Sequence, residues 1–221
     1  CATMSAILFI DTTQDSCQLG LFYNEHLLVH CHTIERQHAA VINSMIANLL
    51  EEQHCSFEEL AAVAVCAGPG SYTGIRVGIA TAQGLGFAKQ IPVYYFSALT
   101  LLNYQWIQEK AAVEGYYCTV LKEREQEVFF EIANENGQIV EEGKHALLAD
   151  FIKTLENYVV NNIYIQSNIN FDFNSINCTQ VFKEAVSISI KQWNQYLQQV
   201  YPLHASLENK AIYLKNVFIL Q

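Results

Sequence analysis

Between Ala61 and Ala88 the composition of the sequence changes twice, from apolar to glycine-rich and then to helix-forming. This succession restricts the folds that the chain can adopt. A short apolar run from Ala61 to Cys66 is typical of a buried strand. A glycine-rich turn follows from Gly68 to Gly74, and the segment from Ile75 to Ala88 has the composition of a helix. The stretch therefore predicts a strand, a tight turn and a helix in direct succession, which is a unit of α/β proteins.

Small residues recur every four positions along the predicted helix, at Gly74, Gly78, Ala82 and Gly86. At this spacing they lie on one face and form a seam that is almost free of side chains. Each glycine costs about 0.5 to 1 kcal/mol of helix stability relative to alanine, so close packing must compensate. The seam predicts that another element, of this chain or of a partner, packs directly against it.

The turn before this helix is a candidate site for an anion. Backbone N–H groups at a helix start favour phosphate or carboxylate, and the residues placed to contact one are Gly70, Ser71 and Thr73. Three more specific motifs are excluded by the residues at their defining positions. A P-loop needs a lysine that is absent, a dinucleotide fingerprint needs a glycine in place of Thr73, and a nucleophile elbow needs a glycine in place of Pro69.

Taken as a whole, Gly68-Pro-Gly-Ser-Tyr-Thr-Gly-Ile-Arg-Val-Gly78 resembles the signature of the TsaB (YeaZ) family. This family is the non-catalytic paralogue of TsaD in bacterial biosynthesis of tRNA N6-threonylcarbamoyladenosine. Further similar segments are Ile7 to Thr13, Arg36-Gln-His38, Ile91-Pro-Val93 and Glu127-Val-Phe129. The second half matches more loosely, with Lys122-Glu-Arg124 where the family usually has Asp-Ala-Arg and with Ala211 to Lys215 in place of Pro-x-Tyr-Leu-Arg.

The order of predicted elements agrees with this resemblance. The first half predicts strands at 5–11, 16–23 and 26–33, a helix at 36–53, a strand at 61–66, a helix at 72–89, a strand at 92–96 and a helix at 97–109. The second half predicts strands at 115–121, 126–133 and 138–146, a helix at 148–158 and a strand at 159–166. Periodicity alone predicts only a mixed α/β fold, but this order is the ribonuclease H-like plan of the actin and sugar-kinase superfamily (ASKHA).

The resemblance implies two ribonuclease H-like lobes, the second a reduced copy of the first. We expect the first lobe at residues 4–100 and the second at 101–221, with the last helix packed on the first lobe. Met4 is the expected start, so residues 1–3 are left out of the first lobe.

Composition indicates the cellular compartment of the chain and the kinds of partner that it does not bind. The chain has 22 acidic and 12 basic residues and a net charge of −10, which opposes direct binding to nucleic-acid phosphates. Its seven cysteines are odd in number and form no Cys-x-x-Cys pair, which is typical of reduced thiols. No apolar run is long enough to span a bilayer and no signal peptide precedes the first predicted strand, so we expect a cytoplasmic protein with no membrane partner.

Two further groups of residues have alternative explanations. Asp11 and Thr12 end the first predicted strand, where ATPases of this superfamily contact phosphate, but a plain strand-end turn explains them equally well. His26, His30 and His32 alternate on a predicted strand, so we expect them on its solvent face and not around a metal.

The resemblance also implies which chemistry is missing. The paralogue TsaD has a His-x-x-x-His metal pair in the region that corresponds to Ser97 to Leu102, and this chain has apolar residues there. We therefore expect no catalytic residue, no metal site and no cofactor of its own, although ATP or ADP could bind at an assembled complex.

By resemblance, the helices at 36–53 and 72–89 pack against the equivalent pair of TsaD. The residues expected at this interface are Arg36, His38, Val41, Met45, Gly74, Arg76, Gly78 and Ala82. TsaE, an ATPase, is the second expected partner, tRNA is reached only through the complex, and the same helices could form a homodimer when TsaD is missing.

The sequence thus predicts a scaffold subunit that supports the transfer of threonylcarbamoyl by TsaD from threonylcarbamoyl-AMP to the adenosine 3′ of the anticodon. The alternative is an independent ATPase or small-molecule kinase of the same superfamily, which would use Asp11 and the turn from Gly68 to Gly74. Against it, residues 118–126 contain no glycine for a second phosphate turn. A peptidase is disfavoured because no Ser/His/acid or metal pattern can be assembled.

Overall fold

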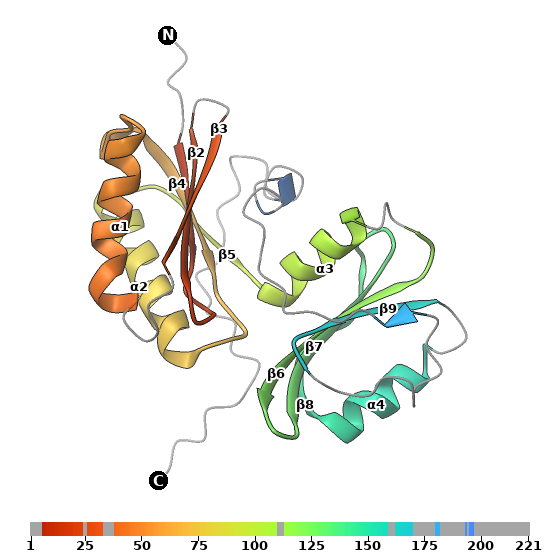
Figure 1. Cartoon of the computed structure of the whole chain (residues 1–221). Coiled ribbons are helices and arrows are strands. Elements are labelled where there is room, and N and C mark those ends of the chain that lie inside the picture. Colours follow the sequence, from red (N-terminus) through yellow and green to blue (C-terminus); the bar gives the residue numbers. More distant parts are fainter. Residues whose placement is uncertain are drawn as a thin grey trace. The chain divides into compact units, whose positions relative to one another are not determined.

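The computed structural model of the chain describes residues 6–23, 26–32, 38–109, 113–158, 162–169, 180–181, 193 and 195–196. These residues form two units, each built on one five-stranded sheet (Figure 1). The first unit extends to Ala98 and also contains Trp193, and the second begins at Leu99. The α/β class predicted from the sequence is confirmed in both units.

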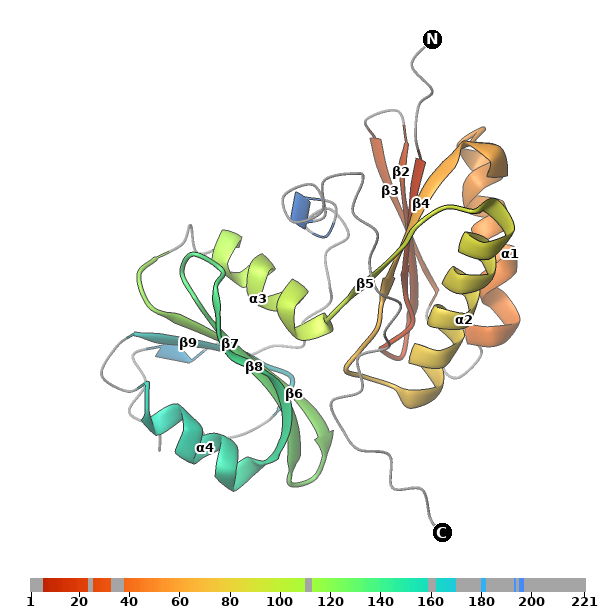
Figure 2. The same ribbon diagram turned by 180° about the vertical axis from the view of Figure 1, so that it is seen from behind.

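The first sheet has the ribonuclease H-like plan that the order of elements predicts. Its strands are β1 (Ala6–Asp11), β2 (Cys17–Tyr23), β3 (His26–His32), β4 (Leu60–Cys66) and β5 (Val93–Phe96), in the spatial order β3-β2-β1-β4-β5. β2 pairs antiparallel with β1 and β3, whereas β4 pairs parallel with β1 and β5. Helix α1 (His38–Glu52) lies between β3 and β4 in the chain, and α2 (Tyr72–Lys89) connects the parallel strands β4 and β5. Both helices cover the same face of the sheet (Figures 1 and 2).

The core of the first unit lies between this sheet and the two helices. β1 is the central strand, and all its residues are buried. Leu8 and Ile10 alternate with residues of the other face and share an apolar cluster with Ile46 of α1 and Ile79 of α2. Burial of each such side chain contributes about 1.5 to 3 kcal/mol, so this cluster fixes both helices on the sheet.

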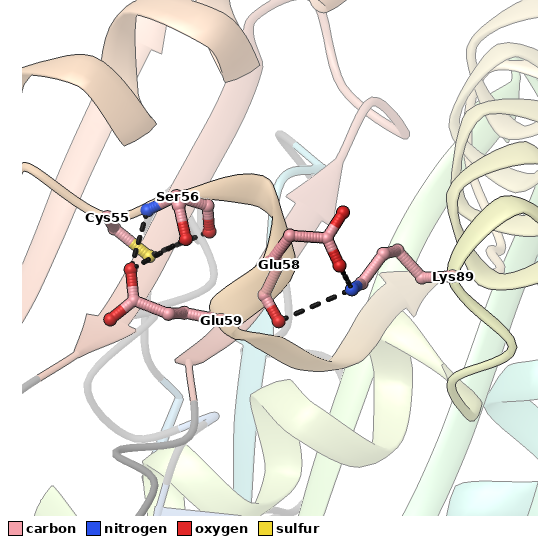
Figure 3. A network of polar contacts seen from close by, with 5 residues as sticks. All are labelled: Cys55, Ser56, Glu58, Glu59 and Lys89. Carbon is pink, nitrogen blue, oxygen red and sulfur yellow. Dashed lines mark hydrogen bonds and ion pairs between the residues drawn. The ribbon is translucent and has the colours of Figure 1, made fainter.

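Both ends of α2 are held by side-chain contacts. At its start, Ser71 Oγ accepts a hydrogen bond from the Gly74 backbone N–H, with 3.2 Å between the two atoms. At its end, the Lys89 ammonium group donates to the carboxylate and to the backbone carbonyl of Glu58 (Figure 3). Glu58 belongs to the short 3₁₀ helix η1 (Phe57–Glu59), so this contact connects the last turn of α2 to the segment before β4.

The start of η1 is a capping box formed by Ser56 and Glu59. Glu59 Oε2 accepts hydrogen bonds from the Ser56 backbone N–H at 2.7 Å and from the Ser56 hydroxyl at 2.9 Å (Figure 3). The Tyr23 hydroxyl of β2 donates to the other oxygen, Glu59 Oε1, at 2.5 Å. This bond, followed by those from Ser56, lowers the pKa of the Glu59 carboxyl group.

The second unit repeats the strand order of the first. Its strands are β6 (Tyr116–Arg124), β7 (Glu127–Asn134), β8 (Ile139–Leu147), β9 (Ile163–Ser167) and β10 (Gln180–Val181), in the order β10-β9-β6-β7-β8. β7 pairs antiparallel with β6 and β8, and β9 pairs parallel with β6 and β10. Helix α3 (Ala98–Glu109) packs on one face of this sheet and α4 (Leu148–Glu156) on the other. A tight turn connects β7 and β8, with Gly137 in a left-handed conformation.

Trp193 covers part of the face of the first sheet that α1 and α2 leave open. Its ring meets Phe9 of β1 and Phe96 of β5 edge-on, with centroid distances of 5.2 Å and 5.4 Å. Of the residues beyond Val181 the structure describes only 193, 195 and 196, so the packing of the last predicted helix on the first lobe stays a prediction.

Candidate functional site

The small-residue seam of α2 faces the chain's own sheet. Gly74, Gly78, Ala82 and Gly86 are all buried. A Cβ atom on Gly78 would overlap the Thr12 hydroxyl, and one on Gly74 would overlap the Thr12 carbonyl oxygen. The prediction that Gly74, Gly78 and Ala82 contact a partner is therefore wrong. The periodicity reveals a smooth helix face, but it does not reveal which element covers that face.

The opposite side of α1 and α2 is exposed, and we call it the outer face. The exposed residues of the two helices are Ala39, Ala40, Asn43, Ser44, Ala47, Asn48, Glu51 and Glu52 of α1 and Tyr72, Thr73, Arg76, Ala80, Gln83, Gly84, Phe87 and Ala88 of α2. Phe87 is 88% exposed, and no atom lies within 4 Å of a Cβ built on Gly84. An aromatic ring thus stands beside a strip of small side chains, on helices that the core holds in place.

The remaining interface candidates differ in their placement. Arg36 lies outside the described residues, as does the side chain of His38. Val41 and Met45 are half-buried, and Met45 packs against the apolar core of the first unit. Arg76 is exposed on the outer face, with its guanidinium group 4.0 Å from the centroid of the Tyr72 ring.

Sequence reasoning missed Ala80, Gly84 and Phe87. They recur at helical spacing, 180° or so away from the seam, and a helical projection of Tyr72 to Lys89 contains this signal. Once the seam is assigned to the sheet, the face opposite to it must be the exposed one.

The end of β1 forms the strand-end turn that was one of the two explanations of Asp11 and Thr12. Asp11 Oδ1 accepts from the Thr13 backbone N–H at 2.9 Å and from the Thr13 hydroxyl at 2.6 Å. The Thr12 hydroxyl donates to the Gly74 carbonyl oxygen at 2.7 Å, and the Ser71 N–H donates to the Thr13 carbonyl oxygen at 2.7 Å. These bonds fasten the glycine-rich turn to β1.

This geometry limits the predicted anion site. Thr12 is fully buried and cannot contact an anion in this conformation, and Asp11 is only 3% exposed. Gly70, Ser71 and Thr73 are exposed, but Ser71 Oγ already caps α2. Contact of an anion with the three exposed residues stays a prediction.

Cys66, at the end of β4, lies close to the same turn. Burial, and secondly the Asp11 carboxylate, hold the pKa of the Cys66 thiol well above its usual value. A neutral, buried thiol is a poor nucleophile, so Cys66 belongs to the packing of the turn.

The described residues contain no group of three His, Cys, Asp or Glu side chains that could hold a metal ion. His26 is exposed, and the side chains of His30 and His32 are outside the described set. In the stretch from Ser97 to Leu102, Ala98, Leu99, Leu101 and Leu102 are buried apolar residues of α3. Among the helices that the structure describes, none has the length and apolar character to cross a membrane.

Comparison with known proteins gives a family and several relatives. A family model described as "TsaD: tRNA N6-adenosine threonylcarbamoyltransferase" matches residues 29–195, which is more than half of the chain. The tRNA threonylcarbamoyladenosine biosynthesis protein TsaB of Escherichia coli K12 is 34% identical over 101 residues, covering 45% of this chain and 44% of that protein. The TsaB protein of Haemophilus influenzae is 34% identical over 96 residues, covering 43% of this chain and 41% of that protein. The matched region thus spans less than half the length of these relatives.

Two solved structures from Pseudomonas aeruginosa have a similar fold. One is described as an uncharacterized protein with similarity to peptidase YEAZ; its TM-score is 0.77 at 21% identity, with 96% of this chain and all of that chain covered. The other is YeaZ, with a TM-score of 0.70 at 22% identity and coverage of 90% and 92%. At this identity the likeness concerns the fold.

The two sheets, with their repeated strand order, place the chain among α/β proteins with two ribonuclease H-like lobes. Within this class the sequence matches narrow the assignment further. The chain belongs to the TsaD family, and among the relatives described above it is similar to TsaB and YeaZ proteins.

Proposed function

We propose that this chain is a non-catalytic subunit in the formation of tRNA N6-threonylcarbamoyladenosine and that it binds TsaD through the outer face of α1 and α2. The names of its TsaB relatives support a place in this pathway. TsaD would carry out the transfer from threonylcarbamoyl-AMP to the adenosine 3′ of the anticodon, and this chain would bind and position it. TsaE would dock on the assembly, with ATP or ADP bound there.

The observation that carries this proposal is the exposure of Phe87 beside small residues. A Phe ring left in water forgoes about 1.5 to 3 kcal/mol that burial would supply. Ala80 and Gly84, one helical turn apart, let a second helix approach the backbone of α2 closely. The surface therefore suits a helix that offers an apolar pocket for the ring and small or flat side chains beside it.

A paralogue with the same fold is a fitting partner for such a surface. Two related lobes can present equivalent helix pairs to one another across an approximate twofold axis, as the subunits of a homodimer do. The same reasoning allows the chain to pair with a second copy of itself when TsaD is missing.

The test uses Gly84→Leu in the full chain together with TsaD from the same organism. The new side chain enters open space in the free protein, and leucine favours a helix more than glycine does, so the variant should stay folded. It should nevertheless lose the complex in size-exclusion chromatography, and the transfer assay with TsaD should lose the stimulation that the unsubstituted chain gives.

The matched control is Leu147→Ala in the second unit, where Leu147 is 53% exposed. We expect Leu147→Ala to leave the complex unchanged and Phe87→Ala to weaken it by about 2 kcal/mol, or roughly 30-fold in Kd. If Gly84→Leu and Phe87→Ala both bind TsaD as tightly as the unsubstituted chain, the interface lies elsewhere.

The isolated chain can also be used to test the alternative function, an independent ATPase or kinase. Titration calorimetry of the isolated chain with ATP should show no tight binding, since the Thr12 hydroxyl is committed to Gly74. Tight binding accompanied by hydrolysis would favour the kinase over the scaffold.

A further inference from the structure

A group of polar side chains lies between α3 and the second sheet. Its members are Thr100 and Asn103 on α3, Thr119 on β6, Glu131 on β7 and Gln166 on β9. Asn103, Thr119, Glu131 and Gln166 are each no more than 5% exposed. Buried polar groups of this number are uncommon unless they bond to one another, and these do.

The hydrogen bonds form a chain that ends at the Glu131 carboxyl group. Gln166 Nε2 donates to Thr119 Oγ1 at 2.7 Å, and Thr119 Oγ1 donates to Asn103 Oδ1 at 2.7 Å. Asn103 Nδ2 then donates to Glu131 Oε1 at 3.2 Å and to the Glu131 backbone carbonyl at 3.2 Å. Thr100 Oγ1 donates to Glu131 Oε2 at 2.9 Å. Both bonds to the carboxyl group come from the first turns of α3.

No positive charge balances Glu131 within the described part of the chain. Opposite Glu131 in register lies the irregularity of β8 that contains Glu142. Other ionisable side chains on the same face of the sheet are Glu127, His145, Tyr117 and Tyr164, and α3 carries Tyr104 and Glu109. None of them bonds to the Glu131 carboxyl group. Burial raises the pKa of this group to about 6, and the bonds from Thr100 and Asn103 oppose the rise.

The neutral carboxyl group fits the network with little rearrangement. A proton on Glu131 Oε2 requires only that the Thr100 hydroxyl rotate and accept instead of donate. The bond from Asn103 and the rest of the chain stay as they are. The ionised group, in contrast, leaves a buried charge that no side chain of the described ranges balances, which is costly in an apolar interior.

The two halves of α3 are held in different ways. Its C-terminal half packs Trp106 and Ile107 against Tyr117 and Tyr164, an apolar contact that does not depend on pH. Its N-terminal half combines the Glu131 network with the buried side chains of Leu99, Leu101 and Leu102, so only this half contains a contact that depends on pH. This half follows Ala98, the last residue of the first unit before the second begins.

We propose that Glu131 is the pH-sensitive element of a latch that holds the N-terminal half of α3 on the second sheet, tightly when the carboxyl group is neutral and more loosely when it is ionised. The latch acts on the segment through which the chain passes from the first unit to the second. It is a regulatory device in addition to the proposed function and does not depend on it.

The sign of the effect follows from proton linkage. A carboxyl group that is harder to ionise in the folded state than in the unfolded state stabilises the fold below its unfolded pKa of 4.5, and this contribution is lost as the pH rises through about 6. Between about pH 4.5 and pH 7.5, opening of residues 99–104 should therefore become more favourable by a factor on the order of tenfold to thirtyfold.

Hydrogen exchange of the full chain, corrected for the intrinsic effect of pH, measures this opening. In the unsubstituted chain the protection of the first turns of α3 should fall across this pH range. In Glu131→Gln, whose amide reproduces the neutral carboxyl group, protection should stay constant. Glu127→Gln is the matched control, since Glu127 lies on the same strand but bonds to His145; it should behave like the unsubstituted chain.

Equal loss of protection in the unsubstituted chain and Glu131→Gln would overturn the latch. Should Glu131→Gln fail to fold, carbon-13 NMR titration of the Glu131 carboxyl group in the unsubstituted chain decides the matter. A midpoint near 6 supports the latch, and a midpoint near 4.5 excludes it.

Discussion

Gly78 and Gly84 lie on the same helix but have opposite surroundings. Gly78 faces β1, where the Thr12 hydroxyl lies almost in the place of a missing Cβ atom. Gly84 faces outward, with no atom in reach of a Cβ. Gly78 is required by the fold, whereas Gly84 only lowers the stability of the helix. The presence of Gly84 therefore indicates a role other than stabilising the fold.

Alanine substitution at these two glycines should change the free energy of unfolding in opposite directions. Gly84→Ala should raise the free energy of unfolding by about 0.5 to 1 kcal/mol, because alanine favours the helix and meets no neighbour. Gly78→Ala should lower it by about 1 to 3 kcal/mol, because the Thr12 hydroxyl must move and its bond to Gly74 is disturbed. Urea unfolding followed by circular dichroism measures both; equal effects of the same sign would contradict these assignments.

Helix α2 has two faces with different surroundings, one packed on the sheet and one exposed. Its inner face is fixed by the sheet, and its last turn is fixed by the Lys89 contact with Glu58 (Figure 3). Its outer face is therefore presented in a defined orientation, which lowers the cost of ordering when a partner binds.

Self-association of the isolated chain should depend on Phe87. An apolar ring that is 88% exposed favours pairing of the outer face with a second copy at high concentration. Phe87→Ser should shift the chain towards the monomer in sedimentation velocity at several concentrations. Leu147→Ser, at an exposed apolar residue of the second unit, should leave the distribution unchanged.

The same helix illustrates what sequence patterns can and cannot predict. Strand, turn and helix from Ala61 to Ala88 are predicted correctly because periodicity and glycine placement are local properties. The direction in which the seam faces is not local, since it depends on Thr12 and Val93 from distant strands. The Glu131 network was missed for a similar reason: its five members come from four separate elements, and no spacing along the chain connects them.

At the scale of the whole molecule, the net charge opposes direct binding of nucleic acid but does not oppose binding of a protein partner. With 22 acidic and 12 basic residues, the chain carries a net charge of −10 and repels phosphates at moderate salt. The exposed residues of α1 and α2 carry few charges: Arg76 on α2, and Glu51 and Glu52 at the end of α1. The surface is thus suited to a helix pair and not to an RNA backbone.

The isolated chain should therefore fail to bind tRNA under conditions in which its complex with TsaD binds. Filter binding at low and at near-physiological salt measures this directly, because phosphate contacts weaken steeply as salt rises. We expect retention of tRNA by the complex and none by the chain alone, and Gly84→Leu should behave like the chain alone when mixed with TsaD at matched concentrations. Salt-sensitive binding of tRNA by the isolated chain, with affinity equal to that of the complex, would mean that this chain itself binds the tRNA and would contradict the proposed role as a scaffold.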